Sequence, residues 1–114
     1  MRLYGIKNCN AVKKGCEFLR NLGFEYEFLD IKKLDKTTLQ AWLKEKSFET
    51  LINTAGLSAK KLNLNKEKVL HLSQSVSGRK ELEELILQSP TLIKRPVVEY
   101  KGQIFVGKEY ENLK

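Results

Sequence analysis

The sequence is short of the residues that build metal sites and disulfide frameworks. Its 114 residues include two cysteines and a single histidine. A structural zinc site needs four ligands, usually in closely spaced pairs, whereas Cys9 and Cys16 stand well apart and His71 is remote from both. We therefore expect no metal site. We also expect both thiols to be reduced, which is their usual state in the cytoplasm.

Long apolar runs are also missing. No run approaches the roughly 18 to 20 residues that span a bilayer. The N-terminal stretch "MRLYGIKNCN" lacks the apolar region and the small-residue cleavage site of a secretory signal. We expect a soluble cytoplasmic protein that does not enter a membrane. Because no internal repeat and no linker rich in proline, glycine and serine is present, we expect one domain over residues 1–114.

Acidic residues are in the minority. The chain has 14 Asp and Glu against 21 Lys and Arg, and its formal net charge is +7. Such a charge attracts anions of several kinds: small oxyanions, glutathione carboxylates, nucleic acid or an acidic protein. No basic helix interleaved with aromatic residues is evident, and no Cys/His nucleic-acid module is present. We therefore expect no direct binding of nucleic acid.

The first third of the chain has the pattern of a strand, a helix and a second strand. Residues 2–6, "RLYGI", include an aromatic and a β-branched residue, which favour a short buried strand. Val12, Cys16 and Leu19 recur at helical spacing, and Gly23 stands where a helix ends. Residues 24–31 alternate between apolar and acidic side chains, as in a half-buried strand. Because crossovers are right-handed, the two strands should be parallel.

The middle of the chain is predicted to be helical, and the end to be a hairpin. Asp35 and Asn65 can each cap a helix, Ser77 can cap a third, and residues 47–64 are irregular with a short helical turn. Pro90 ends the third helix. The final residues predict two strands around a Lys101–Gly102 turn and a short closing helix: 96–100, 103–107 and 108–114. The fold class is α/β.

A disulfide between the two cysteines is disfavoured by helix geometry. If both lie on one helix, seven residues span about 10 Å of axis. A disulfide needs Cα atoms roughly 4.4 to 6.8 Å apart. Cys16 lies on the apolar stripe, where a free cysteine packs as a small hydrophobe. We interpret Cys16 as part of the core.

Cys9 has a different position, at the junction of the first strand and the first helix. Unpaired N–H groups and the helix dipole stabilise negative charge at such a junction. The thiol pKa should therefore fall below its free value of about 8.5. Lys13, one turn on, should lower the pKa further, and Lys7 is nearby in the sequence. The alternative is that Cys9 is simply the first residue of a helix.

Several motifs together resemble a known family over nearly the whole chain. They are "LYGIKNCNAVKKGCEFLRNLGFEYEFLDIKK", "LINTAGLSAKKLN", "LQSPTLIKRPVV" and "VGKEYENL". The chain resembles the arsenate reductase (ArsC)/Spx superfamily, and most closely its YffB-type branch. The resemblance implies a thioredoxin-like fold with a helical subdomain inserted between strands 2 and 3. The core would be about residues 1–33 and 89–114, and the insert about 34–88.

The resemblance also implies roles for individual residues. Cys9 matches the redox cysteine of the family, and Arg95 and Pro96 match an arginine followed by a proline in the cis form. Lys13 and Lys60 stand where the family has arginines. Lysine keeps the charge but lacks the planar fork that suits an oxyanion. These replacements count against efficient arsenate reduction.

The function implied is that of a thiol-dependent oxidoreductase of the arsenate reductase type. Cys9 would be the catalytic thiol, with Lys13, Lys60, Arg95 and Pro96 around a small oxyanion or a mixed disulfide. No cofactor would be bound. Glutathione would be the co-substrate, and glutathione or glutaredoxin would regenerate Cys9. The alternative is an Spx-like regulator that binds the RNA polymerase α subunit without turnover.

Overall fold

The computed structural model describes residues 1–113, which form two compact units. The sheet unit comprises Met1–Lys33 and the segment from Lys94 onward, and the helical unit comprises Leu34–Ile93. The chain leaves the sheet unit after Lys33, where the family resemblance places the boundary. It returns after Ile93, a few residues later than the resemblance implies. The shift has a packing reason, because Leu92 and Ile93 are fully buried and Ile93 forms a β-bridge with Ile52 of the helical unit.

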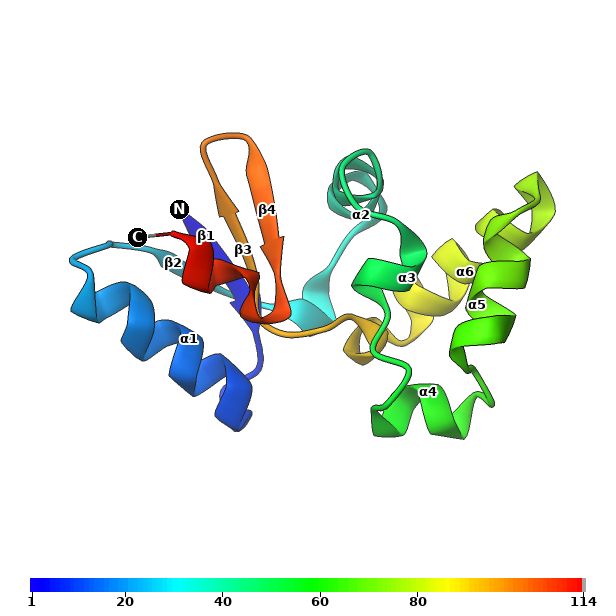
Figure 1. Cartoon of the computed structure of the whole chain (residues 1–114), viewed down its shortest axis with the longest axis horizontal. Helices are drawn as coiled ribbons and strands as arrows, with labels where there is room; N and C mark the ends of the chain where they lie inside the picture. Colours follow the sequence, from blue (N-terminus) through cyan, green and yellow to red (C-terminus); the bar gives the residue numbers. More distant parts are fainter. Residues whose placement is uncertain (114) are drawn as a thin grey trace. The chain divides into compact units, whose positions relative to one another are not determined.

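The sheet unit is built on four strands in the order β2-β1-β3-β4 (Figure 1). The strands are β1 (Arg2–Gly5), β2 (Glu27–Asp30), β3 (Val97–Tyr100) and β4 (Gln103–Val106). β1 and β2 are parallel, whereas β3 is antiparallel to both β1 and β4. The predicted crossover and hairpin are therefore confirmed. The arrangement is the thioredoxin-like one, with the helical segment inserted between β2 and β3.

The second strand is shorter than its alternating pattern predicts. Pairing of β2 with β1 begins at the register Arg2↔Glu27, so the residues before Glu27 have no partner strand to bond with. Phe24 and Tyr26 keep the predicted alternation all the same, since both are half-buried against the core of the unit. The side-chain pattern was correct, and the strand boundary was wrong.

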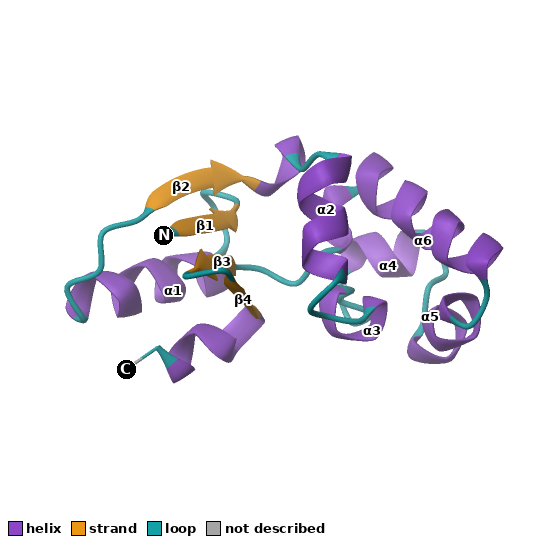
Figure 2. Cartoon of the chain, turned by 90° about the horizontal axis from the view of Figure 1, so that it is seen from above, coloured by secondary structure: helices purple, strands orange, loops and turns teal. Residues whose placement is uncertain are grey.

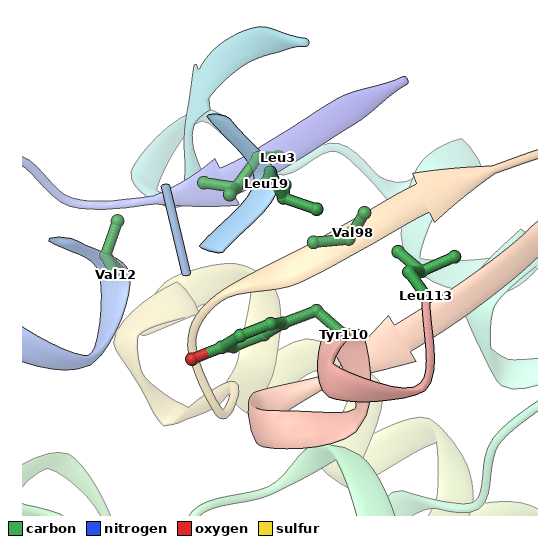
Figure 3. Packing of buried hydrophobic residues seen from close by; sticks show 6 residues of the cluster. All are labelled: Leu3, Val12, Leu19, Val98, Tyr110 and Leu113. Atoms are coloured by element: carbon green, nitrogen blue, oxygen red, sulfur yellow. The ribbon is translucent and has the colours of Figure 1, made fainter. Parts of the chain in front are cut away.

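Helix α1 (Asn10–Asn21) and the C-terminal 3-10 helix η3 (Gly107–Asn112) lie on the same face of the sheet (Figure 2). The core between these helices and the sheet is a cluster of buried residues from β1, α1, β3 and η3, with one residue that follows η3 (Figure 3): Leu3, Val12, Leu19, Val98, Tyr110 and Leu113. The buried face of α1 runs through Val12, Gly15 and Leu19. Cys16, predicted to be core, is half-buried at the margin of this face.

The hairpin between β3 and β4 turns at the predicted two residues. Lys101 has φ +51° and Gly102 has φ +76°, so both central residues are in the left-handed region. This is the backbone of a type I′ turn, whose twist matches that of the flanking strands. Glycine adopts this conformation without steric cost, which explains why Gly102 is suited to the second position.

The helical unit contains five α-helices and the 3-10 helix η2 (Pro90–Leu92). The α-helices are α2 (Lys36–Leu43), α3 (Phe48–Leu51), α4 (Leu57–Lys61), α5 (Lys66–Ser73) and α6 (Val76–Gln88). Two short helices therefore occupy the region predicted to be irregular with one helical turn. The buried residues include Leu39, Trp42, Val69, Leu82 and Ile86. In the part of the chain that is described, no helix is both long enough and apolar enough to cross a membrane.

Side-chain caps explain where these helices begin. Asp35 accepts a hydrogen bond from the N–H of Thr38 at 2.8 Å, and Asn65 accepts one from Lys68 at 2.8 Å, as predicted. The prediction that Ser77 caps α6 is wrong. Ser75 is the cap instead, and its hydroxyl accepts from the N–H of Gly78 at 3.0 Å. The sequence "SVS" at residues 75–77 contains two serines that can each cap a helix, so the local pattern did not identify the correct one.

Candidate active site

Cys9 lies at the N-cap position of α1, directly after the two-residue turn that follows β1. Its backbone is extended, with φ −104° and ψ 122°, while its carbonyl already accepts the first helical hydrogen bond, from Lys13 N–H at 3.0 Å. The thiol does not close a side-chain cap, and the first turn contains no acidic residue. The N–H groups at the start of α1 are therefore free to stabilise a negative charge on the Cys9 sulfur. This placement is the one predicted from the sequence.

Arg95 and Pro96 bring a second segment of the sheet unit to the same site. They directly precede β3, and the peptide bond between them is cis, as the family resemblance implies. The carbonyl of Pro96 accepts a hydrogen bond from Gly107 N–H at 2.8 Å, which ties the segment to the start of η3. Pro96 is buried and Arg95 is half-buried. The backbone next to Arg95 is thereby anchored at Pro96.

Gly15 determines how closely this segment approaches α1. A Cβ added to Gly15 would lie 2.9 Å from Cγ of Pro96 and 3.3 Å from Cε2 of Tyr110. Glycine inside a helix costs roughly 0.5–1 kcal/mol relative to alanine, so its presence here has a packing reason. The proline ring occupies the space that a side chain would fill. Gly15 and Tyr110 are site-shaping residues that sequence reasoning missed, although a glycine in mid-helix is a usable signal.

The pKa of the Cys9 thiol is lowered by the groups around it. Burial raises this pKa, but stabilisation of the thiolate by the N–H of Val12 and by the Arg95 donor, followed by the N–H of Ala11 and the Arg95 charge, more than offsets burial. A lowered pKa means a larger fraction of thiolate near neutral pH, and the thiolate is the nucleophilic form. The site therefore favours a reactive sulfur.

The two lysines predicted to join the site have different positions. Lys13 is exposed, and its side chain lines a groove between α1 and β2, so the cation that acts on the sulfur is Arg95. Lys60 is exposed on α4 and belongs to the helical unit. Within the sheet unit, the structure therefore brings together Cys9, Arg95 and Pro96. The spacing of four residues correctly predicted that Lys13 is one helical turn from Cys9. It did not predict which way the lysine side chain points, and the cation at the sulfur is Arg95.

Cys16 is a separate thiol. It lines the groove between α1 and β2 and hydrogen-bonds with Tyr26; burial, and then this contact, raise the pKa of the Tyr26 hydroxyl. Both cysteines are free. Cys9 contacts Arg95, whereas Cys16 faces β2, so their environments do not overlap. The two thiols therefore lie in separate surroundings.

We predict that Arg95→Gln shifts the pH dependence of Cys9 alkylation. The thiolate reacts and the thiol does not, so the rate rises with pH through the Cys9 pKa. Losing the guanidinium removes a hydrogen bond and a positive charge that favour the thiolate, so the midpoint should move to higher pH. The measurement is the rate of iodoacetamide labelling at Cys9 between pH 5 and pH 10, read by peptide mass spectrometry.

Lys13→Gln is the matched control for this experiment, because it removes one cation from the same region. Its midpoint should stay at the wild-type pH, since Arg95 and the helix amides remain in place. If the two variants shift the midpoint equally, the assignment of Arg95 as the cation that stabilises the thiolate is wrong.

The residues present suit nucleophilic chemistry at sulfur. Among residues 1–113, no group of three or more His, Cys, Asp or Glu side chains could hold a metal ion. A thiolate at a helix N-terminus, next to a guanidinium, can attack an electrophilic centre and exchange with a disulfide. The same guanidinium can pair with an anionic group on the molecule attacked.

Comparison with known proteins places this arrangement in a family. The model of the ArsC family matches residues 4–114, which includes the Cys9 loop and the Arg95–Pro96 segment. The chain belongs to the ArsC family. Its thioredoxin-like fold, with the helical insert, is the fold of that family, as the sequence motifs predict.

Several solved structures are similar to this ArsC-family chain over almost its entire length. A protein named YFFB is 34% identical with a TM-score of 0.77, and the match covers 97% of this chain and 96% of that one. An arsenate reductase related protein from Brucella melitensis is 33% identical with a TM-score of 0.70, covering 98% and 91%. A protein from Streptococcus mutans named as a possible arsenate reductase is 29% identical with a TM-score of 0.77, covering 98% and 95%. The likeness to the YffB-type branch is thereby confirmed.

Proposed function

We propose that this ArsC-family protein is a thiol-dependent oxidoreductase of the arsenate reductase type, which uses Cys9 as its single catalytic thiol and glutathione as its reductant. The observation that carries the proposal is the contact of the Cys9 sulfur with Arg95 at the start of α1, which lowers the thiol pKa. Relatives described as arsenate reductase related, or as a possible arsenate reductase, support the reaction class.

The reaction balances with two thiols as the source of electrons. With arsenate, the Cys9 thiol and one glutathione thiol each lose one electron and form a mixed disulfide. Arsenate gains both electrons and is released as arsenite and water. A second glutathione, or glutaredoxin, then attacks the glutathione sulfur of the mixed disulfide and frees the Cys9 thiolate, which leaves oxidised glutathione or glutathionylated glutaredoxin. With a glutathione mixed disulfide as substrate, Cys9 attacks sulfur instead of arsenic and the substrate thiol leaves.

Each residue near the sulfur has a role in this scheme. Arg95 stabilises the attacking thiolate and offers N–H donors to the anionic group of the substrate. Pro96 forms the wall of the site against α1. Lys13, exposed on α1, would contribute positive charge to the approach of an anion, and Lys60 lies in the helical unit. Because lysine replaces arginine at both positions, we expect disulfide exchange to be faster than arsenate reduction.

The proposal is tested on the wild-type protein by two measurements. Exposure to oxidised glutathione should add one glutathione at Cys9 and none at Cys16, as seen in the intact mass and in peptide fragments. In an assay with glutathione, glutaredoxin and glutathione reductase, either arsenate or a mixed-disulfide substrate should drive NADPH consumption.

Two outcomes would overturn the proposal. One is an unmodified Cys9 after prolonged exposure to oxidised glutathione. The other is an absence of turnover with both substrates. If turnover is absent and the protein retains the RNA polymerase α subunit in a pull-down, the protein is an Spx-like regulator instead.

A further inference from the structure

A groove that neither Cys9 nor Arg95 lines runs along α1. It lies between the helix and β2, encloses about 500 Å³, and includes Lys13, Cys16 and Arg20 from the helix and Tyr26 and Phe28 from the opposite side. From residue 13 to residue 20 the helix rises about 10 Å, which is the length of roughly three residues of extended chain. The groove has the length and the partly apolar lining to receive an extended peptide.

A second groove of about 640 Å³ adjoins the first at the carboxyl ends of β1 and β2. Lys7 and Phe28 line both grooves, so the two are continuous. Lys32 and Lys33 of the 3-10 helix η1 (Ile31–Lys33) line its far side. We name the combined channel the α1–β2 channel.

The α1–β2 channel is strongly basic. Its lining has five cations and only two carboxylates: Lys7, Lys13, Arg20, Lys32 and Lys33 against Glu17 and Asp30. In the described part of the chain, none of the five cations forms a salt bridge with a carboxylate of the protein. The Asp30 carboxylate accepts the backbone N–H of Lys32 at 2.9 Å, so it is already engaged. The charge that remains to be matched is positive.

The channel also borders an open strand. β2 is at the end of the sheet order and pairs only with β1 within residues 1–113. A strand at a sheet edge has a row of N–H and C=O groups that an added strand can bond to, while side-chain pockets select its sequence. Half-buried Tyr26 and Phe28 supply apolar contact on the α1 side of this edge.

We propose that the α1–β2 channel binds an extended acidic segment of a protein partner. Carboxylates of the segment pair with the five cations, its alternate apolar side chains contact Tyr26 and Phe28, and its backbone lies along β2. The partner is thus a polypeptide that combines acidic and apolar residues. This inference does not depend on the chemistry of Cys9.

The observations favour a peptide over nucleic acid. Glu17 and Asp30 lie within the lining, and exposed Glu25 and Glu27 flank it. Carboxylates at these positions repel a continuous phosphate backbone, whereas a peptide of mixed composition can place neutral residues opposite them.

The test uses three labelled probes and fluorescence anisotropy. The first is a decapeptide of alternating Glu and Val, the second has Gln in place of every Glu, and the third is a ten-nucleotide oligothymidylate. We expect the Glu-Val peptide to bind wild-type protein, and to bind more weakly as salt is raised. The triple variant Arg20→Gln, Lys32→Gln, Lys33→Gln should bind it about tenfold more weakly.

The matched control is the triple variant Lys68→Gln, Lys80→Gln, Lys108→Gln, which has the same net charge but changes exposed lysines elsewhere. It should bind the Glu-Val peptide within about twofold of wild type, since local pairing and not net charge sets the affinity. Cys9→Ser should bind like wild type, which separates this inference from the proposed reaction. Two results with the peptides would overturn the inference: no peptide binds, or the Gln-Val peptide binds as well as the Glu-Val peptide. Equal weakening of binding in both triple variants would also overturn it. So would tighter binding of oligothymidylate than of the acidic peptide.

Discussion

The Cys9→Ser protein should lose on the order of 10³-fold or more of the wild-type rate of thiol transfer, because the variant lacks the only nucleophile of the proposed reaction. A serine hydroxyl at the same place stays protonated at neutral pH. The helix amides and Arg95 stabilise the Cys9 thiolate, whereas the serine hydroxyl does not ionise and so provides no nucleophilic anion. The measurement is NADPH consumption in the glutathione-coupled assay, with whichever of the two substrates the wild-type protein turns over.

Cys16→Ser is the matched control, since it makes the same sulfur-to-oxygen change on the same helix. Cys16 faces β2 and Tyr26, so its replacement should leave the rate within about twofold of wild type. A large loss in Cys16→Ser would mean that Cys16 resolves the mixed disulfide. Cys9 would then be one member of a pair, and the single-thiol mechanism would fail.

The Gly78→Ala protein should have a free energy of unfolding about 2–4 kcal/mol below that of wild type. Gly78 is buried in the first turn of α6, where a Cβ would lie 2.0 Å from the carbonyl oxygen of Leu72 in α5 and 2.8 Å from Oγ of Ser75. The carbonyl belongs to the backbone, so it cannot rotate away. Alanine favours the helix by about 1 kcal/mol, which is too little to offset the clash.

Urea denaturation followed by tryptophan fluorescence measures this effect directly. Trp42 is the single tryptophan of the chain and is buried in the helical unit that contains Gly78. Ser77→Ala is the control, because it adds no atom to the buried side of the helix; its free energy of unfolding should lie within about 0.5 kcal/mol of wild type. A Gly78→Ala protein as stable as Ser77→Ala would show that α5 and α6 are not packed as the structure has them.

The N-termini of the helices show which features local sequence can predict and which it cannot. Asp35 and Asn65 were predicted as caps and are caps, because the side-chain oxygen and the N–H that it accepts are only three residues apart. The α6 cap was placed at Ser77 and lies at Ser75, since the same local rule allows both serines and only the packing of α6 against α5 distinguishes them. The boundary of β2 was missed for a similar reason, because a strand ends where its partner ends.

The sequence by itself determined the order of the elements, the hairpin turn, the place of Cys9 at a helix start and membership in the ArsC family. These depend on side-chain periodicity, on turn and cap residues close together in the chain, and on ordered motifs. Only the tertiary structure decided that Arg95, and not Lys13, is the cation at the Cys9 sulfur. It also decided that Gly15 occupies the buried centre of α1 beside Pro96 while Cys16 lies at its margin. The physical reason is that such contacts join segments far apart in the chain, and their distances follow from strand order, register and packing, which no local pattern specifies.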